Sequence, residues 1–438
     1  MNKMNGNETP SLECNERIQT EPRRQKYLGD RGLIALITFL SAFVPLSTDL
    51  YLPTLPGMAL YFDVSADLVN LTLILFLVFF AIGMLFWGPL SDKYGRRPVL
   101  LIGLSVYTAA SFACAGSWDI YHLIAFRILQ AIGGSAAFAV ATAMIKDVYD
   151  RKRREPILAM VQSMVLIAPA AAPVLGALLL KFMSWRGEFL ALAFIGLLAL
   201  AGSIALQETI DKRNTGSILQ TLGRLYTVAR NPGFSSLLCL FSLPMVSAMA
   251  FIASSSYIYI NGFGLNAQVY SYYFAINAIG MIFGPILYMR VSRRYTRRSI
   301  ILACFAIISA SGLLISFVGG FQPWMLAIVL LPATICGSGV RVPGANLMLE
   351  QQREDTGSAA ALLNCFATFL GSIGMTIISL NWSNTILVLG MMNILVGLAG
   401  VMLWMRISQK PFVMQVPERY IAAASIKLKS TGEKNEDK

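Results

Sequence analysis

The sequence predicts an all-α membrane protein whose twelve transmembrane helices form two six-helix halves. Three observations predict this fold class: an apolar composition, long apolar runs, and basic residues confined to alternate connections. The 438 residues are 56% hydrophobic and only 13% charged, with a mean hydropathy of +0.63. Soluble domains of ordinary composition are less apolar, so a chain that crosses the bilayer several times is expected.

The number of spans follows from the apolar runs. About 20 residues are needed to cross roughly 30 Å of hydrocarbon as a helix. Runs of this length, in order, occupy residues 32–55, 66–89, 97–116, 119–145, 155–181, 187–207, 234–259, 267–289, 299–319, 323–348, 357–379 and 384–406. An even number of spans places both termini on the same side of the membrane.

The basic residues orient these spans, because Lys and Arg near span ends remain in the cytoplasm. One set of alternate connections contains Lys93, Arg96 and Arg97; Lys146 and residues 151–154; Lys212, Arg213, Arg224 and Arg230; Arg290, Arg293, Arg294, Arg297 and Arg298; and Arg353. The opposite set contains only Lys181 and Arg186. Both termini are therefore predicted to be cytoplasmic.

Two internal matches indicate that the halves are related copies. YGRRPVLL at 94–101 resembles YTRRSIIL at 295–302, and GSA followed by Asp147 resembles GSG followed by Glu350, at offsets of 201 and 203 residues. The expected organisation is a cytoplasmic tail (1–31), a first half (32–207), a cytoplasmic linker (208–233), a second half (234–406) and a second cytoplasmic tail (407–438). Paired helical halves with a central site are typical of transporters.

Other function classes lack the residues that they require. The six cysteines are scattered without a CxxC pair, and His122 is the only histidine. These residues give no metal-ligand spacing and no His-based catalytic triad, so we expect neither an enzyme nor a metal site. The net charge of +12 comes from short clusters between apolar runs rather than from a solvated basic domain, which argues against nucleic-acid binding.

Asp49 and Arg127 are ionisable residues inside apolar runs. Counted from the outer ends of their spans, both lie about 10–12 Å deep at 1.5 Å per residue. Desolvation and a nearby guanidinium have opposite effects on a carboxyl group, which can leave it able to exchange a proton near neutral pH. Two alternatives remain: Asp49 is a solvated boundary residue before Pro53, and Arg127 forms an ion pair that only holds helices together.

Further residues are candidates for a substrate cavity. Arg341 lies deeper than Arg127, where it either faces the cavity and attracts an anionic or polar substrate or extends toward the inner interface. Tyr51, Tyr273 and Asn277 lie near the outer ends of the first and eighth spans. Aromatic residues there often belong to the interface belt, but an amide such as Asn277 within a span needs a partner.

GPLSDKYGRRPVLL at 88–101 resembles the signature loop of the major facilitator superfamily. Every fixed position of that pattern is matched by Gly88, Leu90, Asp92, Lys93, Gly95, Arg96 and Arg97. The resemblance implies the major facilitator fold. It also implies that Gly88, Asp92, Gly95, Arg96 and Arg97 belong to a gating loop that helps to latch the halves in the outward-facing state.

Three more stretches resemble signatures of proton-coupled members. LIAFRILQAIGGSAA at 123–137 contains the expected Arg127 and Gln130 but has Ala131 where glycine is usual. APAAAPVLGA at 168–177 resembles the antiporter motif of the fifth span in Pro169, Pro173 and Gly176, although Ala172 stands where glycine is typical. PLSTDLYLPTLP at 45–56 resembles the first span of twelve-span drug:proton antiporters, especially the bicyclomycin and chloramphenicol resistance (Bcr/CflA) group.

This resemblance implies a secondary transporter that exports small amphipathic drugs across a bacterial cytoplasmic (inner) membrane, driven by the proton gradient and without a cofactor. Asp49 and Arg127 would couple protons, and Tyr51, Gln130, Tyr273, Asn277 and Arg341 would line the substrate cavity. The expected partners are the drug, protons and the lipid bilayer, and we expect a monomer. The alternative is a nutrient or metabolite transporter of the same fold.

Overall fold

The computed structural model describes residues 25, 27–149, 151–210, 218–352 and 356–414. Most of both predicted tails, and Lys212, Arg213 and Arg353, lie outside the described residues. The elements are α1 (Gly29–Ser41), α2 (Phe43–Asp49), η1 (Leu52–Thr54), α3 (Leu55–Phe62), α4 (Ala66–Tyr94), α5 (Arg96–Ala115), α6 (Ile120–Val148), α7 (Arg151–Leu179), α8 (Trp185–Ile204), α9 (Ile218–Ala229), α10 (Pro232–Ser256), the π-helical turn η2 (Tyr257–Gly262), α11 (Ala267–Val291), α12 (Arg297–Val318), α13 (Pro323–Glu350), α14 (Thr356–Ser379), α15 (Thr385–Ile407) and α16 (Pro411–Met414).

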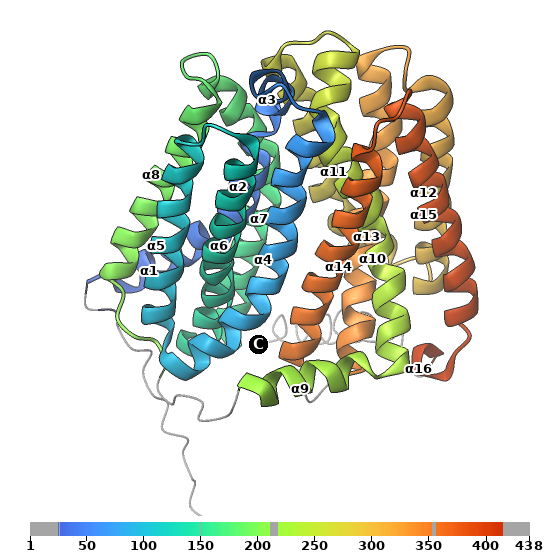
Figure 1. The fold of residues 1–438 in the computed structure, drawn as a ribbon. Helices are drawn as coiled ribbons and strands as arrows, with labels where there is room; N and C mark the ends of the chain where they lie inside the picture. The colour runs from blue at the N-terminus through green and yellow to red at the C-terminus, as the bar shows by residue number, and fades with distance from the viewer. Residues whose placement is uncertain (1–24, 26, 150, 211–217, 353–355, 415–438) are drawn as a thin grey trace, which may run out of the picture.

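The number of predicted spans is confirmed. Twelve helical segments in the described ranges are long and apolar enough to cross a membrane, and each overlaps a predicted run, with ends that differ by up to seven residues. The first span combines α1, α2, η1 and α3 into one segment, Gly29–Phe62. Figure 1 shows the spans side by side in two bundles, with α1–α8 in one and α10–α15 in the other.

The two halves repeat the same helix packing. In the first half α4 packs on α6 and α5 on α8, and in the second α11 packs on α13 and α12 on α15. One contact recurs in detail: a Cβ added to Gly83 would collide with Oγ of Ser135, and a Cβ added to Gly284 would collide with Oγ of Ser338. These pairs stand 201 and 203 residues apart, which are the offsets of the two sequence matches.

Prolines divide the first span into short segments. Proline has no N–H, so it cannot bond the carbonyl four residues earlier. Pro45 leaves the Ser41 carbonyl without this partner, and α1 ends at Ser41. Pro53 does the same to the carbonyl of Asp49, and α2 ends at Asp49. The acid therefore stands where the helix of the first span is interrupted.

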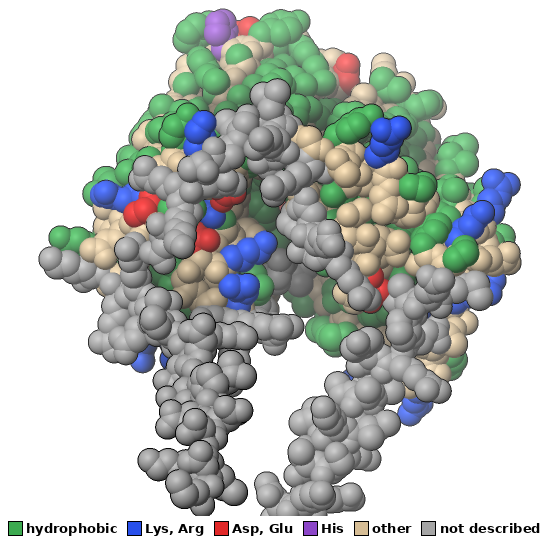
Figure 2. Space-filling view, turned by 90° about the horizontal axis from the view of Figure 1, so that it is seen from below, with side chains coloured by type: hydrophobic (Ala, Val, Ile, Leu, Met, Phe, Trp, Pro, Cys, Tyr) green, Lys and Arg blue, Asp and Glu red, His purple; other side chains and the backbone are tan. Residues whose placement is uncertain are grey.

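The halves contact each other at the end that is far from the basic connections. Asn70, near the start of α4, donates a hydrogen bond of 2.8 Å to Oγ of Ser379 at the end of α14. We call the other end, where the connections with Lys93 and Arg297 lie, the basic face. Figure 2 shows Lys and Arg side chains on this face and a recess between the halves.

The predicted linker contains a helix. Within residues 208–233, α9 lies along the basic face below the two bundles (Figure 1), where it contacts both α4 and α14. The α9 helix has a buried face and an exposed face, since Leu225 and Val228 are buried while Tyr226 is exposed. The connection between the halves is therefore partly ordered against both of them.

Candidate functional site

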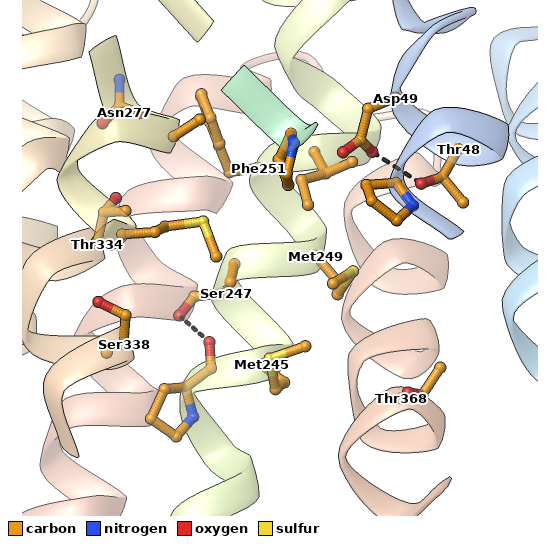
Figure 3. A pocket seen from close by; sticks show the side chains of 18 of the residues that line it. Thr48, Asp49, Met245, Ser247, Met249, Phe251, Asn277, Thr334, Ser338 and Thr368 are labelled. Atoms are coloured by element: carbon orange, nitrogen blue, oxygen red, sulfur yellow. Dashed lines mark hydrogen bonds between the residues drawn. The ribbon is translucent and has the colours of Figure 1, made fainter. Parts of the chain in front are cut away.

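A cavity of about 300 Å³ lies between the two halves, and both halves line it. Its walls are mainly apolar, with Met245, Met249 and Phe251 projecting from α10 (Figure 3). Two ionisable residues are part of its lining: Asp49 from α2 and Arg341 from α13. A mostly apolar cavity with a few polar groups is the usual form of a small-molecule site.

Asp49 is a cavity residue and not a solvated boundary residue in this structure. Only 4% of its surface is exposed. Oγ1 of Thr48 donates a hydrogen bond of 2.9 Å to Oδ1 of Asp49, and the carboxylate points toward Phe251 of α10 (Figure 3). The end of α2 at Asp49 thus presents the acid to the cavity from the first half of the chain.

Arg127 is completely buried in α6, where its guanidinium bonds only neutral oxygens among the described residues. Nη1 donates to the Gln130 amide oxygen at 2.6 Å and to the Ser47 carbonyl at 3.0 Å, and Nη2 donates to the Tyr51 hydroxyl at 3.1 Å. The Phe76 ring covers the guanidinium, with its centroid 4.2 Å from the central carbon. Arg127 therefore ties α6 to the first span.

The structure does not bring Asp49 and Arg127 into contact. Arg127 bonds Ser47 and Tyr51, which stand two residues on either side of Asp49. The bond to Ser47 is made to its backbone carbonyl, and the bond to Tyr51 is made to a hydroxyl group beyond the end of α2. The Asp49 carboxylate borders the cavity instead, and no ion pair joins it to Arg127 in the described part of the chain.

Three of the five predicted cavity residues do not line the cavity. Tyr51 and Gln130 are fully buried in the Arg127 contacts, and Gln130 donates a further hydrogen bond of 2.7 Å to Oγ of Ser111. The Tyr273 ring stacks on the Tyr259 ring at 5.3 Å between centroids. Tyr51 and Gln130 hold helices together because their polar ends find partners within the first bundle, and Tyr273 does so through its ring contact.

Asn277 and Arg341 do line the cavity. Nδ2 of Asn277 donates to the Tyr273 carbonyl at 3.4 Å, while its Oδ1 has no partner among the described residues. Arg341 follows Thr334 and Ser338 on one face of α13, and all three border the cavity. Arg341 therefore faces the cavity in the structure and does not extend toward the inner interface.

The residues of the predicted gating loop meet at the basic face, all within the first half. Nη1 of Arg96 lies 2.5 Å from Oδ1 of Asp92, and its Nε donates to Oδ2 of Asp147 at 2.7 Å. Gly95 adopts a φ of 108°, which L side chains rarely reach, so this turn requires glycine. Gly88 lies inside α4, and Arg97 donates to the Ile204 carbonyl at 2.8 Å.

Glu208 completes this loop, although the sequence reasoning assigned it only to the linker. Its Oε1 and Oε2 accept hydrogen bonds of 2.9 and 3.2 Å from the backbone N–H groups of Arg96 and Arg97. A carboxylate at the first turn of a helix satisfies donors that have no partner within the helix. The sequence offers no motif for it, because the contact spans 112 residues.

The antiporter motif of α7 packs against the segment that contains Asp49. Pro169 borders the cavity, and Pro173 is buried. A Cβ at Gly176 would collide with the carbonyl oxygen of Leu50, the residue after Asp49. Glycine at this position therefore permits α7 to approach the end of α2 closely.

A second buried acid, Glu188 of α8, was also missed. It is 0% exposed, and neither of its carboxyl oxygens has a hydrogen-bond partner among the described residues. Its Oε1 would lie 3.5 Å from a Cβ at Gly176. The sequence signal is an acid one turn inside an apolar span, in WRGEFLALAF. From the sequence alone, Glu188 cannot be distinguished from a solvated residue at the end of the span.

Comparisons with known proteins agree with this architecture. Residues 37–376 match the model of the Major Facilitator Superfamily. The chain is 30% identical over 359 residues to an uncharacterized MFS-type transporter, YdgK, of Bacillus subtilis, covering 80% of this chain and 89% of that protein. It is 32% identical over 369 residues to a chloramphenicol resistance protein of Pseudomonas aeruginosa, covering 81% and 86%.

A solved structure has the same fold. The crystal structure of a D-xylose-proton symporter superposes with a TM-score of 0.65 at 15% sequence identity, covering 89% of this chain and 98% of that one. At this identity the similarity extends to the fold alone. The predicted arrangement of two six-helix halves is the arrangement of that fold.

Proposed function

Since the chain belongs to the Major Facilitator Superfamily, and within it to a group similar to the bicyclomycin and chloramphenicol resistance transporters, we propose that it exports small amphipathic antimicrobial compounds in exchange for protons. It is a transporter and not an enzyme, as predicted. The drugs named for its relatives supply the substrate class of this proposal, and the cavity supplies the place where such compounds bind.

The observation that carries the proposal is the position of Asp49. The carboxyl group of a membrane-spanning segment borders an apolar cavity of about 300 Å³ and has no cationic partner among the described residues. Ionisable groups at such depth are costly and are found mainly where they serve transport or proton transfer. Drug and proton can therefore compete for one site.

The exchange follows from this competition. On the cytoplasmic side ionised Asp49 accepts a hydrogen bond or a positive charge from the drug. After the halves rock, a proton from the outer side binds the carboxyl group and the drug is released. The protonated carrier returns, and loss of the proton to the cytoplasm restores drug binding. Arg127 acts indirectly, by fixing the α2 segment through Ser47 and Tyr51.

The basic face is cytoplasmic in this proposal, by the positive-inside rule. Both termini are then cytoplasmic, and the form described here faces inward, because the Asn70–Ser379 contact closes the opposite end. In this form the ion pairs of Arg96 join the gating loop to Asp92 and Asp147 of the first half. We propose that the working unit is a monomer, since each chain holds a complete cavity.

The test is drug accumulation in everted membrane vesicles whose interior is made acidic. Vesicles that contain the chain are expected to accumulate labelled chloramphenicol, and a protonophore should abolish the accumulation. Vesicles without the chain are the control. Accumulation that persists when the proton gradient is collapsed would contradict proton exchange. Uptake of a metabolite by right-side-out vesicles, with no drug accumulation in everted ones, would favour the nutrient transporter.

A further inference from the structure

The cavity is lined by a cation, Arg341, to which the described residues give no hydrogen-bond or ion-pair partner. Arg341 projects from α13 into the cavity, and it makes no hydrogen bond or ion pair with any residue in the described part of the chain. Arg127, the other arginine deep in the membrane-spanning part, makes hydrogen bonds to four residues. This contrast separates an arginine that holds the bundle together from one that remains available to a ligand.

An unpaired guanidinium in an apolar surrounding is costly, and such groups in membrane proteins mark substrate or ion pathways. The planar guanidinium presents parallel N–H donors that match the two oxygens of a carboxylate. The polar neighbours on the same face, Thr334 and Ser338, are neutral. A carboxylate in a transported compound is therefore the group that complements Arg341 best.

Asp49 lies on the other side of the same cavity. It comes from the first half of the chain and Arg341 from the second, and the methionines of α10 lie between Asp49 and the face of α13 that carries Ser338 (Figure 3). Arg341 follows Ser338 by about one helical turn toward the basic face. The cavity thus presents an acceptor and a donor of opposite charge, separated by apolar surface.

We propose that the cavity binds zwitterionic amphipathic compounds, with their carboxylate on Arg341 and their protonated amine on Asp49. This proposal rests on the proposed function and names a substrate class for the same site. It also agrees with exchange, because a protonated amine binds ionised Asp49 and therefore competes with a proton. A compound with a carboxylate alone would be repelled by ionised Asp49, whereas one with an amine alone would leave Arg341 unpaired.

The experiment compares three compounds that share one planar fluorescent ring system. Ciprofloxacin carries an amine and a carboxylate, its methyl ester lacks the carboxylate, and its N-acetyl derivative lacks the basic amine. Binding to the purified full chain is measured by fluorescence polarisation, which does not depend on transport. Wild type is expected to bind the zwitterion at least tenfold more tightly than either derivative.

Arg341→Gln is expected to remove the preference for ciprofloxacin over the ester while leaving the affinity for the ester unchanged. Arg341→Lys should restore part of the preference, because it restores the charge without the planar fork. Arg290→Gln, at an exposed arginine near the basic face, is the matched control and should behave as wild type. Thermal unfolding of each variant checks that the chain is folded.

Two results would overturn the proposal. One is wild type that binds all three compounds equally, and the other is an Arg341→Gln protein that is folded and still prefers the zwitterion. Either result leaves the proposed function intact if vesicles export chloramphenicol. Conversely, selective zwitterion binding without any proton-driven accumulation would support the binding site and contradict the exchange cycle.

Discussion

Asp49 and Arg127 lie at one level of the membrane-spanning part and yet do not contact each other among the described residues. Arg127 binds the first span through Ser47 and Tyr51, while Asp49, midway between these two residues, borders the cavity. This arrangement separates two tasks that the sequence places side by side. Arg127 fixes the segment, and Asp49 is left available to a proton or a substrate.

The first prediction concerns the Arg127 contacts. Arg127→Met retains an unbranched apolar stem but leaves the Gln130 and Ser47 oxygens without their donor. We expect a loss of about 3 kcal/mol in unfolding free energy, since each unsatisfied buried polar group costs about 1–3 kcal/mol. Tyr51→Phe removes the acceptor of Nη2 and the hydrogen bond between the Tyr51 hydroxyl and Oγ1 of Thr72, and should cost about 1–2 kcal/mol. Chemical unfolding in detergent measures both, and equal costs would contradict the central role of the guanidinium.

The gating loop gives a prediction with an internal control. Gly95→Ala forces a side chain into a φ of 108° and against the Glu208 carboxylate. Backbone strain of this kind costs about 1–3 kcal/mol, so the variant should unfold more easily. Gly88→Ala, in the same motif, has no atom within 4 Å of the new Cβ. Its unfolding free energy should equal that of wild type or exceed it by up to about 1 kcal/mol, because alanine favours the helix interior more than glycine. A Gly95→Ala protein as stable as Gly88→Ala would refute this account of the turn.

Glu188 gives a test of a buried acid without a partner. A buried carboxyl group without a counter-ion is expected to be neutral, because isolated buried charges are very costly. Glu188→Gln keeps the charge of the neutral form and nearly its shape but adds one buried N–H donor, so the unfolding free energy near pH 7 should fall by no more than about 1–3 kcal/mol. A large gain in melting temperature on this substitution would show instead that Glu188 is ionised in the folded protein.

The contact between Tyr149 and Asp30 predicts a pH dependence at the basic face. The Tyr149 hydroxyl donates to Oδ1 of Asp30 at 2.9 Å. Burial, together with this hydrogen bond, raises the pKa of Tyr149 above its ordinary value. A raised pKa in the folded state stabilises the protein below the unfolded-state pKa of about 10. This stabilisation is lost as the pH rises above that value.

The measurement compares wild type with Tyr149→Phe between pH 8 and pH 11.5. Wild type should be the more stable protein at pH 8, and the difference in melting temperature should shrink above pH 10. Other groups that titrate in this range affect both proteins alike, so the difference isolates Tyr149. A difference that is independent of pH would contradict the assignment.

The number, order and approximate ends of the spans could be predicted, because hydrophobic length is a local property of the sequence. That Asp49 and Arg127 lie at one level could be predicted for the same reason. The direction in which each side chain faces could not be predicted. Membrane helices are apolar on most sides, so their sequences contain little information about which face meets the cavity. Tyr51, Gln130 and Tyr273 were therefore assigned to a cavity that they do not line.

The family resemblance supplied the gating loop but not its partners. In the sequence, Asp147 is part of one of the two internal matches and Glu208 is part of the linker. Both contact Arg96 only in the folded protein. Glu188 was missed because an acid one turn from a span end is indistinguishable in sequence from a solvated one. Contacts between residues that are distant in the chain account for most of what the sequence did not predict.

The central claim is that Asp49 exchanges the proton for the drug. The measurement that tests it most directly is drug-stimulated proton release from everted vesicles that contain wild type, Asp49→Asn or the control Asp63→Asn. Asp63 is an exposed acid with a φ of 52°, a conformation that asparagine tolerates. We predict release from wild type and Asp63→Asn and none from Asp49→Asn at equal expression. Equal proton release from all three proteins would contradict the claim.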